Sequence, residues 1–138
     1  MIIDGREVAL TLKKKLAEQL KSFPKKYGRV PHLTIIVVGN DPASHSYIRG
    51  KKKAADFVGI TNTVLKFPSS VNEHELLETI YKLNKDKNVD ALIVQLPLPK
   101  EINERRILDA IAAEKDVDAC NSQNVGKLWT TQNTRSEE

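Results

Sequence analysis

Apolar residues recur with helical spacing near the start of the chain and then form a continuous run. Positions four apart, separated by lysine and glutamate, predict an amphipathic helix over residues 6–23 that is closed by Pro24 and the Gly28 region. Its apolar positions are Val8, Leu12, Leu16 and Leu20. Residues 33–39, LTIIVVG, are a β-branched run without polar alternation. Such a run is typical of a strand covered on both faces in a parallel sheet.

A second helix is predicted after this strand. Asp41 can cap its N-terminus, Pro42 suits its first turn, and Gly59 is expected to end it. The residues expected to face the interior are Tyr47, Ala54, Ala55 and Val58.

Strands and helices continue to alternate in the second half of the chain. Residues 61–67, TNTVLKF, predict a short strand, and Asn72 followed by Glu75 resembles a helix cap. Residues 90–97, DALIVQLP, predict the next strand. Residues 112–129 contain turn residues and no clear period, so we expect irregular chain there. The apolar positions of the third helix are Leu76, Leu77, Ile80 and Leu83, and those of a last short helix are Ile107, Leu108 and Ile111.

This alternation predicts an α/β fold in three layers, with a mostly parallel sheet flanked by helices and joined by right-handed crossovers. We expect one domain over residues 1–128 and a polar, disordered tail over residues 129–138. In such sheets, functional groups gather at the carboxyl ends of the strands.

Composition excludes several classes of protein. The chain of 138 residues is 40% apolar and 29% charged, and it contains no apolar stretch near the roughly 20 residues that cross a bilayer. The N-terminus has no signal-type segment, so a cytoplasmic setting is favoured. The single cysteine excludes an internal disulfide, and the three histidines lack metal-ligand spacing, so we expect no metal.

The net charge of +4 could indicate a nucleic-acid partner, since lysine and arginine neutralise phosphates. The basic residues are spread over separate segments, however, and no nucleic-acid-binding motif is present. We therefore expect no nucleic-acid partner, and a mild positive field could instead attract a small polyanionic substrate.

Tyr47 and Lys51 are the first candidate pair for chemistry. They are four residues apart, so they lie on one face of the predicted helix. A shielded lysine amine is less stable as the ammonium form, which lets it exchange protons near neutral pH. The alternative is that Lys51, Lys52 and Lys53 form a solvated face with their stems along the helix.

Two further segments also allow two interpretations. Gln95 is held at the end of a strand and is followed by two prolines; it could line a crevice or only cap a carbonyl at a strand stop. Residues 115–118, KDVD, could be an ordinary polar turn. Cys120 has no basic partner nearby in the sequence, so we expect a packed residue and not a nucleophile.

Taken together, these segments resemble a known family. Residues 39–60, 89–99 and 115–128 are similar to the bifunctional methylenetetrahydrofolate dehydrogenase/methenyltetrahydrofolate cyclohydrolase family, called FolD in bacteria. The similarity runs in order from IIDGREVA at the start of the chain to Leu128.

The resemblance implies a folate site lined by Tyr47, Lys51, Gln95 and Asp118. In the family, 5,10-methylenetetrahydrofolate gives a hydride to NADP or NAD, and the methenyl product is hydrolysed to 10-formyltetrahydrofolate. Lys51 would transfer protons in the hydrolysis, with Gln95 hydrogen-bonded to it. Tyr47 would pack along the aminobenzoyl group, and Asp118 would bind the donors of the pterin edge.

Two departures from the family pattern limit what the resemblance implies. The family has glycine where this chain has Ala119, and a positive φ there would cost about 1 kcal/mol. Family members also carry a Rossmann domain for the nicotinamide cofactor, and no G-x-G-x-x-G follows any predicted strand here.

We therefore expect the folate-binding catalytic half, without dehydrogenase activity and with weak or no cyclohydrolase activity, because an open cleft hydrates Lys51. The alternative is a truncated, non-catalytic folate-binding or interaction module. Family members form homodimers, and a monomer is possible for this chain.

Overall fold

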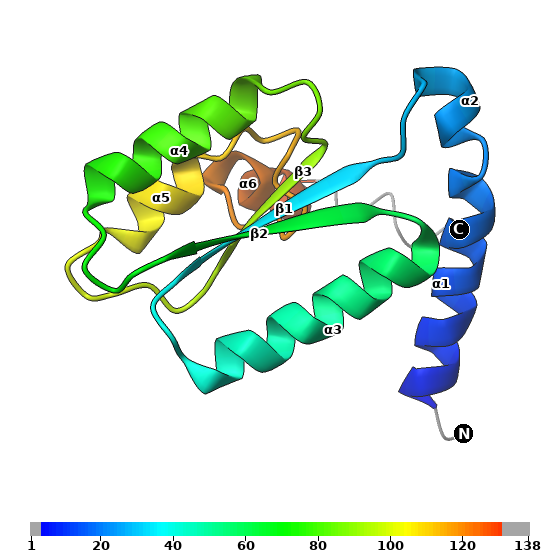
Figure 1. The fold of residues 1–138 in the computed structure, drawn as a ribbon, viewed down its shortest axis with the longest axis horizontal. Coiled ribbons are helices and arrows are strands. Elements are labelled where there is room, and N and C mark those ends of the chain that lie inside the picture. Colours follow the sequence, from blue (N-terminus) through cyan, green and yellow to red (C-terminus); the bar gives the residue numbers. More distant parts are fainter. Residues whose placement is uncertain (1–3, 131–138) are drawn as a thin grey trace.

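The computed structural model describes residues 4–130, and these form a parallel sheet of three strands between helices (Figure 1). The central strand β1, His32–Val38, pairs with β2, Thr61–Phe67, on one side and with β3, Ala91–Gln95, on the other. The strand order is β2-β1-β3, and both pairs are parallel. The predicted α/β fold is confirmed.

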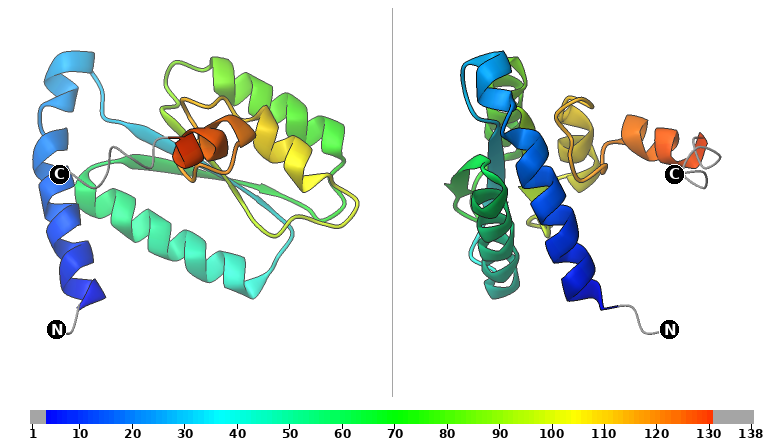
Figure 2. Two further views of the ribbon diagram at one scale, coloured as in Figure 1. Left: turned by 180° about the vertical axis from the view of Figure 1, so that it is seen from behind. Right: turned by 90° about the vertical axis from the view of Figure 1, so that its right-hand side faces the viewer.

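Helices cover both faces of this sheet (Figures 1 and 2). α3 packs on one face, and α4 and α5 pack on the other. The bounds of the helices in the described part of the chain are α1 Gly5–Leu20, α2 Phe23–Tyr27, α3 Pro42–Val58, α4 Glu73–Lys85, α5 Glu104–Ala110 and α6 Ser122–Thr130. None of these helices is long and apolar enough to cross a membrane.

The unbroken apolar character of β1 follows from this layering. Ile36 and Val38 belong to the core under α4 and α5, whereas Ile35 and Val37 belong to the core under α3. Because successive side chains of a strand point to opposite faces, a strand between two helical layers needs apolar residues at every position.

The predicted helix caps at α3 and α4 are confirmed. The Asp41 carboxylate accepts hydrogen bonds from the backbone N–H groups of Ala43 and Ser44, and the Asn72 side chain accepts one from Glu75. Gly59 ends α3 with a φ of 84°, a conformation that favours glycine. These short-range signals fix where the helices begin and end.

The predicted first helix is divided in the structure, and its apolar face is not covered. α1 ends at Leu20, and α2 follows as a separate short helix closed by Gly28. α1 packs on α3 and not on the sheet, and none of its residues is fully buried. The positions Val8, Leu12 and Leu16 are exposed, because periodicity predicts a helix but does not say what covers it.

The predicted interior face of α3 is wrong at Tyr47, whose exposed fraction is 66%. The buried residues of this helix are Ser44, Ile48, Ala55 and Val58. Successive helical residues are about 100° apart around the axis, so burying Ile48 turns its neighbour Tyr47 to the edge of the helix.

The irregular chain predicted over residues 112–129 is also wrong in part, because α6 occupies its second half. Residues of the predicted tail, Trp129 and Thr130, lie in α6, and residues 131–138 lie outside the described part of the chain. α6 buries no residue fully.

Candidate functional site

The candidate residues come from three segments that meet beside β3. Lys51 lies on α3, Gln95 is the last residue of β3, and Asp118 lies in the segment between α5 and α6. That segment is joined to the sheet by a parallel bridge between Asp116 and Leu92. The fold therefore brings Asp118 beside α3 although the two segments are far apart in the sequence.

Lys51 and Asp118 form an ion pair. The distance between Lys51 Nζ and Asp118 Oδ2 is 3.1 Å, and the side chains are 30% and 41% exposed. Ile48 and Ala55 are buried, and they lie on the same side of α3 as Lys51. Their packing fixes the rotation of α3 about its axis and so directs the Lys51 side chain. The Lys51 amine is thus sheltered on one side and open to solvent on the other, and water screens its attraction to Asp118.

Gln95 does not form the hydrogen bond to Lys51 that the resemblance implies. Its Nε2 donates to the backbone oxygen of Leu96 at 2.9 Å, and Lys51 donates to Asp118 instead. The Gln95 Oε1 atom is buried and has no hydrogen-bond partner in the described structure. A buried acceptor without a donor costs about 1–3 kcal/mol, so this oxygen is suited to receive a donor from a ligand or a moving side chain.

Tyr47 lies one helical turn before Lys51 and is mostly exposed. Its ring is therefore available at the rim of the site for contact with a flat ligand. It does not contribute to the core, in contrast to the prediction from the helical pattern.

The segment that carries Asp118 is held by a buried acid that the sequence analysis did not single out. Asp116 is 8% exposed. Its carboxylate accepts hydrogen bonds from the backbone N–H groups of Cys120 and Asn121, at 3.2 and 2.9 Å, and from the Asn124 side chain at 3.0 Å. No sequence pattern marks this role of Asp116, because its bridge to Leu92 forms only in the tertiary structure.

α5 holds the same segment from its other end. The Asp109 carboxylate accepts from the backbone N–H of Ser122 at 2.7 Å and from its hydroxyl at 3.0 Å. These Ser122 bonds, with a smaller contribution from Arg105, keep the pKa of Asp109 below its ordinary value. Arg105 also donates to the backbone oxygen of Cys120.

Cys120 is partly buried in this segment. Burial, together with the carboxylates of Asp118 and Asp116, raises the pKa of the Cys120 thiol. A raised pKa disfavours the thiolate, so Cys120 is not set up as a nucleophile.

The helix N-termini near this end of the sheet do not fit a dinucleotide. A pyrophosphate needs free backbone N–H groups at a helix N-terminus, close to glycine-rich chain. Asp41 already occupies these groups in α3, and Asn72 occupies one in α4, beside the acidic Glu73. The N-termini of α3 and α4 therefore offer no fit to the pyrophosphate of NADP or NAD.

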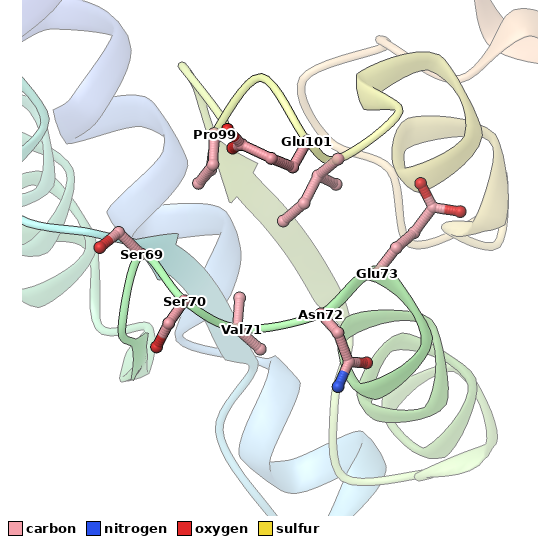
Figure 3. A pocket seen from close by; sticks show the side chains of 8 residues that line it. Ser69, Ser70, Val71, Asn72, Glu73, Pro99 and Glu101 are labelled. Atoms are coloured by element: carbon pink, nitrogen blue, oxygen red, sulfur yellow. The ribbon is translucent and has the colours of Figure 1, made fainter.

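A pocket of about 620 Å³ is lined by residues other than the four candidates (Figure 3). It is formed between the segment after β2 and the segment after β3, and its charged lining residues are Glu73 and Glu101. Glu73 is already paired with Arg106 at 2.8 Å. An acidic pocket does not suit a folate, which carries carboxylates, so this hollow is not the candidate site.

Comparison with known proteins identifies the family. Residues 3–118 match the family described as tetrahydrofolate dehydrogenase/cyclohydrolase, catalytic domain. The bifunctional protein FolD of Francisella philomiragia is 46% identical over 127 residues, which are 92% of this chain and 45% of that protein. The mitochondrial bifunctional methylenetetrahydrofolate dehydrogenase/cyclohydrolase of Gallus gallus is 42% identical over 96% of this chain and 39% of its own length. The chain spans less than half the length of these relatives.

Solved structures agree with this assignment. The 5,10-methylenetetrahydrofolate dehydrogenase of the silkworm, Bombyx mori, has a TM-score of 0.88 and 45% identity, over 92% of this chain and 44% of that one. The Trypanosoma brucei dehydrogenase-cyclohydrolase, solved with NADP and an inhibitor, has a TM-score of 0.86 and 36% identity, over 93% of this chain and 43% of that one. The chain therefore belongs to the tetrahydrofolate dehydrogenase/cyclohydrolase family, and it matches the catalytic domain of that family.

Proposed function

We propose that this chain binds a reduced folate beside β3 and supports the hydrolysis of 5,10-methenyltetrahydrofolate to 10-formyltetrahydrofolate. The observation that carries the proposal is the Lys51 amine, which lies 3.1 Å from the Asp118 carboxylate, in a segment that is bridged to β3. Membership of the catalytic-domain family supports the choice of substrate.

In the proposed reaction, Lys51 moves protons. A water oxygen adds to the bridging methenyl carbon and loses one proton, which leaves a hydroxyl on that carbon. The bond from the carbon to N5 then breaks, N5 gains a proton, and the hydroxyl loses its proton to solvent as the formyl C=O forms. The net change is the addition of one water and the release of one proton. Proton transfer by a positioned side chain of this kind is general acid–base catalysis.

The other residues bind and orient the substrate. The Asp118 carboxylate matches the paired N–H donors of a pterin edge, and the exposed ring of Tyr47 offers a surface for the aminobenzoyl group. When the pterin occupies Asp118, the Lys51 amine loses that partner. The buried Gln95 Oε1 is then the acceptor that would receive and orient it.

Hydride transfer from 5,10-methylenetetrahydrofolate to NADP or NAD would use the same folate site. The nicotinamide cofactor supplies the hydride acceptor when bound. Since the N-termini of α3 and α4 offer no fit to its pyrophosphate, we propose that residues 4–130 contribute only folate binding to that step and that the chain by itself has no dehydrogenase activity.

The setting that we propose follows from the resemblance. It is a cytoplasmic role in one-carbon folate metabolism, including the supply of purine biosynthesis, with the chain as a monomer. Light scattering after size-exclusion chromatography tests the monomer, because a homodimer would double the measured mass.

Hydrolysis of 5,10-methenyltetrahydrofolate, followed by its absorbance, tests the proposal. We expect weak hydrolysis above the buffer rate that is lost in Lys51→Met and in Lys51→Arg. Arginine keeps the positive charge beside Asp118 but does not release its proton near neutral pH. The matched control is Lys52→Met, on the exposed side of the same helix, which should keep the activity.

Equal rates for the wild type and Lys51→Met would reject a catalytic role for this lysine. Folate binding without any hydrolysis would instead favour a non-catalytic folate-binding module.

A further inference from the structure

We propose that Asp116 is a positioning residue that holds Asp118 opposite Lys51. The proposal deepens the proposed function and rests on it where folate binding is concerned. It assigns a role to the first acid of the KDVD segment, which does not itself contact Lys51.

The carboxylate of Asp116 closes the chain around Asp118 into a loop. The backbone at Asp116 is fixed to the sheet, because Asp116 bridges Leu92 and the Leu92 N–H donates to the backbone oxygen of Lys115 at 2.8 Å. The side chain of the same residue reaches forward to the backbone N–H groups of Cys120 and Asn121. The residues between these two anchors have little freedom to move.

The loop turns the side chains in opposite directions. Asp116 points into the protein and is nearly buried, whereas Asp118 is 41% exposed and meets Lys51. The two acids thus have different roles. The Asp116 carboxylate accepts hydrogen bonds from backbone N–H groups, whereas the Asp118 carboxylate remains accessible to a ligand.

The backbone conformation at Ala119 fits the same account. Its φ of 54° reverses the chain just before Cys120. This reversal turns the N–H groups of Cys120 and Asn121 back towards Asp116. Without the carboxylate as acceptor, these N–H groups would lose their partner, and a left-handed alanine would have little to hold it.

Asp116→Asn is the variant that tests this role, because it preserves size and removes one acceptor oxygen. One of the two loop N–H groups then faces an NH2 group and loses its hydrogen bond. Hydrogen exchange in the full chain should become at least about tenfold faster at whichever amide, of Cys120 or Asn121, loses its bond, while β1 is unchanged. The nuclear Overhauser effect between the side chains of Lys51 and Asp118 should weaken. Asp56→Asn, the same change on α3, is the control and should alter neither measurement.

A binding cycle separates positioning from general loss of structure. The probe is 5-formyltetrahydrofolate, a stable reduced folate, and its Kd is measured for the wild type, Asp116→Asn, Asp118→Asn and the double variant. If Asp116 acts through Asp118, Asp116→Asn raises Kd about tenfold, but it adds less than about twofold when Asp118 is already changed. Fully multiplicative effects would overturn the proposal.

Two outcomes remain, and both are decisive. If the wild type does not bind the probe, folate binding fails, and the exchange rates and the Lys51 contact alone decide whether Asp116 positions Asp118. If Asp116→Asn does not fold, wild-type scalar couplings across the hydrogen bonds from the amides of Cys120 and Asn121 to the Asp116 carboxyl carbon decide. Their presence supports the proposal, and their absence overturns it.

Discussion

Ala119 stands where the resemblance to the family implies a glycine. Its φ of 54° is the one positive φ recorded for a residue other than glycine within residues 4–130. Strain is expected at this position only if the turn needs such a conformation, and the structure meets that condition. An L-residue in the left-handed region costs about 1–2 kcal/mol, which the hydrogen bonds to Asp116 offset.

Ala119→Gly should therefore raise the free energy of unfolding by up to about 1 kcal/mol, because glycine adopts positive φ without steric cost. Urea denaturation measures the change. The control is Ala9→Gly inside α1, which should lower the free energy of unfolding by about 1 kcal/mol, since glycine is unfavourable in a helix interior. A lower stability for Ala119→Gly would show that the turn is not strained.

At the scale of the elements, the sequence predicts helix bounds that depend on neighbouring residues, but it does not predict elements that depend on residues far apart in the chain. Asp41, Asn72 and Gly59 act within their own turns, so the sequence predicts the bounds of α3 and α4. α6 depends on Asp109, which lies 13 residues before Ser122 and reaches it only after α5 has packed. No local pattern contains that information.

An ion pair joins the N-terminal segment of the chain to the start of β3. Arg29 meets Asp90 through two hydrogen bonds, of 2.6 and 2.8 Å, and the His32 backbone N–H donates to the same carboxylate at 2.8 Å. The bond from Arg29 is the main cause that keeps the pKa of Asp90 below its ordinary value, against a smaller opposing effect of burial.

This pair predicts a pH dependence of stability. Because the pKa of Asp90 is lower in the folded than in the unfolded chain, its contribution is complete above about pH 4 and is lost as the pH falls through the folded value. Asp90→Asn should lower the free energy of unfolding at pH 6 by about 1 kcal/mol and should reduce its decrease between pH 4 and pH 2. Urea denaturation at each pH measures both effects. An unchanged acid slope in Asp90→Asn would contradict this assignment.

At the scale of the whole molecule, the sequence predicts the order of strands and helices. It predicts less well which helix faces and side chains contact one another. The β-branched runs and the alternation of elements predict a parallel sheet, which the structure confirms. The apolar period of α1 predicts a helix, but not that Val8 and Leu12 are exposed in the folded chain. Likewise, the resemblance names Lys51, Gln95 and Asp118, but only the structure shows that Lys51 pairs with Asp118 and not with Gln95.

The central claim is that Tyr47, Lys51, Gln95 and Asp118 surround one folate site. Its most direct test is a titration of the isotope-labelled chain with 5-formyltetrahydrofolate, followed by the backbone amide shifts. We predict the largest shifts at these four residues and their neighbours, with little change at Ser70 and Glu101 in the acidic pocket. Shifts centred on that pocket, with none at Lys51 and Asp118, would contradict the account.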